Sequence, residues 1–169
     1  MKTRKLTTMA LLTVIALTIY IIEAQIPVPI PIPGVKLGLS HIVTVYAVYA
    51  LGSREGALIL LARILLGAIF SGNFASVFYS AAGGAPAILT TIALKRVLSE
   101  KQLWISGCLS AIAHSIGQML FALWASGTLL FLIYLPILVV CSIFSGIFTG
   151  LCTQLVLKRG KNLWKTIFK

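Results

Sequence analysis

The stretch from Gly52 to Gly84 limits most strongly how this chain can fold. It contains two apolar segments that meet near Gly72 and Asn73, and Arg63 lies inside the first of them. Arg63 follows Arg54 by nine residues, which places it ~14 Å along a helix. Because the apolar layer of a bilayer is ~30 Å thick, this charge is expected near the midplane. A charge at that depth costs roughly 3 kcal/mol or more, so a partner, a polar cavity or an anionic ligand must compensate it.

The composition requires a membrane environment. The 169 residues are 59% hydrophobic and 10% charged, and the mean hydropathy is +1.05. A soluble domain of this size cannot bury so much apolar surface, so we expect a multi-pass protein of the cell membrane. The net charge of +11 does not indicate nucleic-acid binding, because the basic residues stand at the ends of apolar segments, as helix anchors do. The chain has no aspartate, and its three cysteines lie in apolar segments without CxxC spacing, so we expect no metal, cofactor or disulfide framework.

We predict an all-α polytopic bundle of six transmembrane helices. The N-terminal apolar run resembles a signal peptide but is long enough to span and lacks a small-residue cleavage site, so it is read as a retained first helix. Residues 1–157 are predicted to form one domain, and 158–169 a basic amphipathic tail on the anionic inner leaflet. The predicted spans are 6–26, 38–51, 56–71, 73–94, 103–125 and 128–157.

The basic residues also predict the orientation. With both termini in the cytoplasm, twelve Lys and Arg residues lie on the inner side, and Lys36 alone lies outside. The outer loop around Lys36 carries prolines at positions 27, 29, 31 and 33, which favour an extended chain. This loop is either a stiff connector or an apolar lid over an outward cavity. In the fourth span, the run AAGGAP is expected to interrupt the helix against a cavity.

Several polar side chains are expected to converge inside the bundle. Counting helical rise places Arg63, the glycine pair and His114 at one level, with Gln118 one turn above His114 on the same face. The candidate ligand-binding residues are Arg63, His114, Gln118, Gly83, Gly84, Tyr79, Asn73, Lys36, His41 and Glu23.

Two of these residues have alternative explanations. His114 is either a packed histidine satisfied by a neighbouring helix or part of a ligand site. Arg63 either pairs internally with Glu23, despite an axial offset of ~11 Å, or meets an anionic ligand or a cluster of Tyr79, Ser80 and carbonyl groups.

Four motifs occur in order along the chain: PGVKLGLSH (33–41), REGALILLARILLGAIFSGNF (54–74), SAAGG (80–84) and HSIGQ (114–118). Together they resemble the Gx transporter family, also called heptaprenyl diphosphate synthase component I. That family is similar to the substrate-binding S components of energy-coupling factor transporters, which are six-helix bundles with an outward cavity. The resemblance implies a partner, either a membrane-anchored NusG-like domain protein or an energising module. The positions that match the motifs are Lys36, Gly38, Arg63, Gly67, Gly83, Gly84, His114 and Gln118.

The chain departs from this pattern in two places. His41 stands where the family usually has asparagine, and the first span lacks the AxxxA repeat that S components present to their coupling subunit. The sequence also lacks the aspartate-rich motifs with which prenyl diphosphate synthases hold Mg²⁺, so we do not expect a catalytic synthase. The predicted function is a substrate-binding membrane subunit for a small anionic or isoprenoid- or quinone-related molecule. The alternatives are a membrane scaffold for prenyl-quinone synthesis or flavin-linked electron transfer, and an intramembrane enzyme.

The topology can be tested with reporter fusions. A reporter placed after Lys169 should report the cytoplasm, and one inserted between residues 27 and 36 should report the outside, because the basic residues favour the inner face. Reporters found on the same side would contradict the six-span arrangement.

Overall fold

The computed structural model describes residues 2–25 and 38–167, and this part of the chain is helical, with no strand. The proline-rich loop and Lys36 lie outside it. Six α-helices follow one another in the described residues: α1 (Lys2–Gln25), α2 (His41–Ala50), α3 (Ser53–Ser71), α4 (Ala75–Val97), α5 (Leu103–Ser126) and α6 (Leu135–Ile167). Short 3₁₀ turns precede α5 at Glu100–Gln102 and α6 at Leu129–Tyr134. The predicted all-α fold is therefore confirmed.

The helix ends follow from local chemistry. Gly72 and Gly127 adopt left-handed conformations, with φ of 63° and 64°, at the ends of α3 and α5. Glycine ends helices in this way because it has no Cβ to clash there. Pro136 lies in the first turn of α6. Proline lacks an N–H, but N–H groups in the first turn have no partner within the helix, so no helical hydrogen bond is lost. The 3₁₀ turn before it changes the chain direction, so Pro136 starts the helix and does not bend it.

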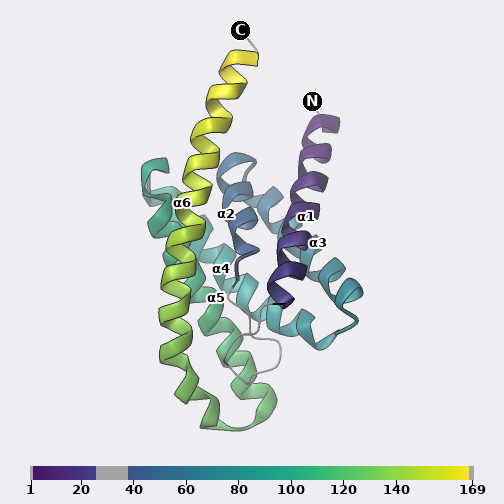
Figure 1. The fold of residues 1–169 in the computed structure, drawn as a ribbon, viewed down its shortest axis with the longest axis vertical. Helices are drawn as coiled ribbons and strands as arrows, with labels where there is room; N and C mark the ends of the chain where they lie inside the picture. Colours follow the sequence, from purple (N-terminus) through teal and green to yellow (C-terminus); the bar gives the residue numbers. More distant parts are fainter. Residues whose placement is uncertain (1, 26–37, 168–169) are drawn as a thin grey trace.

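The outer surface of the bundle is apolar. Large hydrophobic side chains such as Leu65, Ile69, Leu89 and Phe144 are more than half exposed, which suits contact with lipid. Four of the described helical segments are long and apolar enough to cross a membrane: Thr3–Gln25, Ala75–Val97, Glu100–Ser126 and Leu129–Gly160. The six-span topology and the cytoplasmic position of both termini stay predictions. Figure 1 shows the two ends of the chain at the same end of the bundle, opposite the α5–α6 connection.

The core has two parts. Helix α5 packs along its length against α4 and against α6, and Met119, Ala122 and Leu138 form an apolar cluster between α5 and α6. Helices α1, α2 and α3 form the other part, around Val43 and Ile59. In the described residues α1 contacts α2 and α3 but not α6.

Glycine allows α5 and α6 to approach closely. A Cβ added at Gly107 would lie 2.4 Å from the carbonyl oxygen of Gly146, and one added at Gly150 would lie 2.6 Å from the carbonyl oxygen of Leu103. The backbones therefore touch, as the GxxxG spacing of Gly146 and Gly150 predicts.

The expected interruption of the fourth span is wrong. α4 runs unbroken through Gly83, Gly84 and Pro86. Pro86 has no N–H to offer the carbonyl of Ala82 four residues earlier. Gly117 of α5 covers this region, since a Cβ there would lie 2.1 Å from the Ala82 oxygen and 2.7 Å from Pro86 Cγ. The small residues thus serve close helix packing, and neighbouring α5 keeps the proline-containing helix intact.

The glycine seam between α5 and α6 generates a stability prediction. Gly107→Ala should lower the free energy of unfolding by about 1–3 kcal/mol, because its Cβ meets backbone that cannot rotate away. Thermal unfolding in detergent measures this loss. Gly160→Ala is the control, because nothing lies within 4 Å of its added Cβ. Equal melting temperatures for the two variants would contradict the packing account.

Candidate functional site

Arg63 is the buried cation of the candidate site. Its side chain is 4% exposed and comes from the middle of α3. One guanidinium nitrogen, Nη1, donates a hydrogen bond to the hydroxyl of Ser40. The guanidinium carbon lies 5.6 Å from the centroid of the Tyr20 ring, a cation–π contact. The Nε atom is buried and has no hydrogen-bond partner among the described residues. Arg63 is therefore only partly compensated.

Glu23, near the end of α1, binds the start of α2. Its side chain is 2% exposed. One carboxylate oxygen accepts a hydrogen bond from the N–H of Gly38 at 2.5 Å, and the other accepts from the N–H of Ser40 at 3.4 Å. Within the described residues Glu23 and Arg63 form no direct ion pair. Ser40 lies between them, bound to Glu23 through its N–H and to Arg63 through its hydroxyl.

Two buried histidines lie beside this group. The rings of His41 on α2 and His114 on α5 stack with their centroids 6.1 Å apart. Nε2 of His41 is 2.9 Å from the hydroxyl of Ser110. Nδ1 of His114 lies against Gly83 without a hydrogen bond of ordinary geometry. His114 is therefore incompletely satisfied by its neighbouring helices.

These side chains enclose a small polar cavity. Its volume is about 10 Å³, near the lower limit for holding one water molecule. The site is therefore closed in this structure. The cavity is lined by Tyr20, Glu23, Gly38, Ser40, Arg63, Ser80, His114 and Gln118.

The glycine pair of α4 has two separate roles. A Cβ added at Gly83 would lie 2.7 Å from Cγ of Gln118 and 2.8 Å from Cε1 of His114, so Gly83 makes room for both. Gly84 faces α3 instead, since a Cβ added there would lie 3.3 Å from the methyl groups of Leu60. Gly83 belongs to the wall of the site, and Gly84 to the packing behind it.

The structure brings together Arg63, His114, Gln118, His41, Glu23 and Gly83, as the sequence predicts. It does not bring in Tyr79 or Asn73. The Tyr79 ring packs edge-on against Phe121, with centroids 4.9 Å apart, and Asn73 is exposed in the turn before α4. Lys36 lies outside the described residues.

Two residues that line the cavity, Tyr20 and Ser40, are not among the candidates that the sequence predicts. A tyrosine or serine in an apolar segment carries no specific signal. The position of Ser40 next to His41 was the one available hint.

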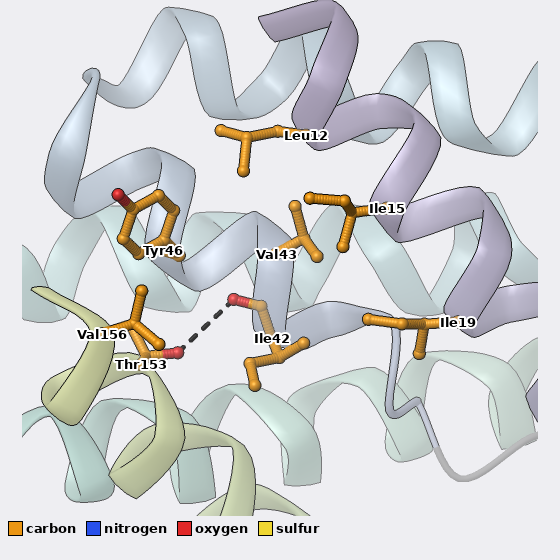
Figure 2. Close-up of a pocket in the computed structure, with 8 residues that line it drawn as sticks. All are labelled: Leu12, Ile15, Ile19, Ile42, Val43, Tyr46, Thr153 and Val156. Carbon is orange, nitrogen blue, oxygen red and sulfur yellow. Dashed lines mark hydrogen bonds between the residues drawn. The ribbon is translucent and has the colours of Figure 1, made fainter. Parts of the chain in front are cut away.

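A second, apolar cavity borders α2. Figure 2 shows it between α1, α2 and α6, with Leu12, Ile15 and Ile19 on one wall and Val156 opposite. Its volume is about 320 Å³. The Thr153 hydroxyl on its wall donates to the carbonyl of Ile42 at 3.4 Å, so this polar group is satisfied internally. The cavity therefore suits an aliphatic group.

In the described residues no three His, Cys, Asp or Glu side chains form a group that could hold a metal ion. The site is built instead from one cation, one carboxylate, two imidazoles and several hydroxyl groups.

The apolar outer surface and the four long apolar helices fit an integral membrane protein. Residues 12–156 match the family model described as heptaprenyl diphosphate synthase component I. The chain therefore belongs to the heptaprenyl diphosphate synthase component I family, also called the Gx transporter family, and the predicted resemblance is confirmed. The description implies a membrane component that works with another component of the system. Searches of curated proteins and of solved structures gave no match.

The two glycines of α4 allow a matched test of the site wall. Gly83→Ala should lower the melting temperature in detergent, because the added methyl displaces His114 and Gln118. Gly84→Ala should change it less, because its nearest neighbours are flexible leucine methyl groups at 3.3 Å. A larger loss for Gly84→Ala would contradict the assignment of Gly83 to the wall.

Proposed function

We propose that this protein is a substrate-binding integral membrane subunit of a transport-type system in the cell membrane. Its ligand is a small anionic or isoprenoid- or quinone-related molecule, and the subunit itself is not catalytic. The observation that carries the proposal is Arg63, a buried guanidinium that no carboxylate contacts directly within the described residues.

Arg63 has hydrogen-bonding capacity left for a ligand. A guanidinium offers five N–H donors in a planar fork that matches two oxygens of a carboxylate or phosphate. The hydroxyl of Ser40 accepts one hydrogen bond from Nη1 of Arg63, and the Nε–H of Arg63 has no acceptor among the described residues. Ionisable groups at membrane depth are expensive and generally serve a function. An anionic ligand group would supply the acceptors that the protein lacks here.

The apolar cavity supports the isoprenoid or quinone part of the proposal. It borders Ile19 and Ile42, whereas the polar cavity borders Tyr20 and Ser40, so the two cavities border neighbouring residues in α1 and at the start of α2. An amphiphilic ligand could place its charged group at Arg63 and its tail in the apolar cavity. Because the polar cavity holds at most about one water molecule, ligand entry requires α1 and α2 to separate.

A second candidate function is a membrane scaffold that does not transport. The observation that favours it is the closed polar cavity of about 10 Å³. In that case the subunit would anchor a partner in prenyl-quinone synthesis or flavin-linked electron transfer. The predicted partners, a NusG-like membrane protein or an energising module, belong to these proposals.

Mass spectrometry of the purified protein separates the two candidates. Denaturation should release a bound anionic or isoprenoid-like molecule from a substrate-binding subunit. A protein that repeatedly releases nothing beyond bulk lipid would support the scaffold.

Substitutions at Arg63 test the role of its charge. Arg63→Met should leave the protein folded, because it removes a costly buried charge, but it should abolish ligand retention. Arg63→Lys keeps the charge and loses the two-pronged geometry, so retention should fall about tenfold. Released ligand is quantified by mass spectrometry, and thermal unfolding checks the fold. Full retention by Arg63→Met would refute charge selection.

A further inference from the structure

We propose that the N–H groups of Gly38 and Ser40, together with Arg63, form an oxyanion subsite that Glu23 occupies in the closed protein. The ligand's carboxylate or phosphate group would displace the Glu23 carboxylate and take its hydrogen bonds. This inference rests on the proposed function, and it identifies which atoms hold the charged end of the ligand.

The first observation is the convergence of two backbone donors on one carboxylate. Gly38 and Ser40 immediately precede α2, a helix of ten residues, and their N–H groups bind the two oxygens of Glu23. Gly38 has φ of +79°, a left-handed conformation that helps to aim alternate N–H groups at one point. Helix N-termini favour anions because their first N–H groups are unbonded and carry partial positive charge.

The second observation is independent of the helix end. Arg63 comes from another helix, is 4% exposed and lines the same cavity as Glu23, Gly38 and Ser40. Its Nε donor has no partner among the described residues. The subsite therefore combines two backbone donors with an incompletely used guanidinium.

Glu23 has the chemistry of the ligand group that we infer. Its carboxylate presents two oxygens about as far apart as two oxygens of a phosphate group, so either oxyanion would satisfy the same two N–H groups. Two anions cannot share this buried position beside one guanidinium, because like charges repel strongly in a low dielectric. Binding is therefore competitive, and Glu23 must leave as the ligand arrives.

The same contact explains how the site stays closed. Gly38 packs directly over the His114 ring. A Cβ added at Gly38 would lie only 3.2 Å from Cδ2 of this ring. Glu23 fixes this segment through two hydrogen bonds, and Arg63 fixes it through Ser40. Releasing Glu23 breaks two of these three hydrogen bonds. It therefore frees the subsite and also loosens residues 38–40, which cover it.

The test is Glu23→Gln in the full-length protein in nanodiscs. Gln keeps the shape and one acceptor oxygen but removes the competing charge. Inorganic phosphate, inorganic diphosphate and acetate are titrated separately, and the dissociation constant is read from ligand-induced shifts in thermal unfolding. Glu23→Gln should bind at least one of these anions about tenfold or more tightly than the wild type. The anion with the largest gain distinguishes a phosphate from a carboxylate ligand.

Glu55→Gln is the matched control, because it removes the same formal charge from a residue that pairs with Lys5 away from the cavity. Its affinity should equal that of the wild type. An affinity of Glu23→Gln equal to or weaker than wild type, or no binding up to 10 mM (roughly the weakest affinity of interest), overturns the subsite. Arg63→Met in the Glu23→Gln background should abolish binding. Retained binding there means instead that the proposed role of Arg63 is wrong.

Discussion

The structure depends on a short helix whose N-terminal end, with the N–H groups of Gly38 and Ser40 that precede it, lies inside the bundle. α2 has ten residues, which span ~15 Å, about half of the apolar thickness of a bilayer. Unsatisfied backbone groups in such surroundings cost several kcal/mol each, roughly as much as a lost buried hydrogen bond. Neighbouring helices supply the hydrogen-bond partners. Before the N-terminus of α2, Glu23 of α1 accepts a hydrogen bond from the N–H of Gly38. Within α2, the carbonyl of Val48 accepts a hydrogen bond from Lys95 of α4 at 2.6 Å. Arg63 then balances Glu23 through Ser40. The buried charges thus follow from the need to complete a half-length helix.

The start of α2 also lies close to two different chemical environments. The polar cavity borders Ser40, just before the helix, and the larger apolar cavity borders Ile42 and Val43 in its first turn. A place for a charged group and a place for a hydrocarbon chain therefore lie within three residues of each other. Short helices that end within a membrane often direct their N-termini at anionic groups in transporters, which is the physical basis for treating α2 as the central element of the site.

The sequence was sufficient for the all-α class and the family, because long apolar runs and ordered motifs are strong signals in a membrane chain. It also named most of the polar side chains that the structure gathers inside the bundle. Counting helical rise put Arg63 and His114 at one level with Gln118 one turn above, and the structure shows all three lining the same cavity. The same count set Glu23 ~11 Å above Arg63 and could not show that both reach Ser40, since helix tilt and side-chain length are not in the count. The glycine pair was misjudged for a related reason. Glycine and proline weaken an isolated helix, whereas here His114, Gln118 and Gly117 of α5 fill the space that the small residues leave.

The glycine seam between α5 and α6 has a mechanical consequence. Backbones in direct contact, as at Gly107 and Gly146, cannot slide without steric overlap, so α4, α5 and α6 act as a stiff wall. Helix α1 is not attached to α6 in the described part of the chain, and the apolar cavity lies between them. Helix α2, in contrast, is tied to this wall by hydrogen bonds: Val48 accepts from Lys95 of α4, His41 pairs with Ser110 of α5, and Ile42 accepts from Thr153 of α6. Glu23 therefore lies on a helix with fewer ties to the wall than α2 has, whereas His114 is part of the wall itself.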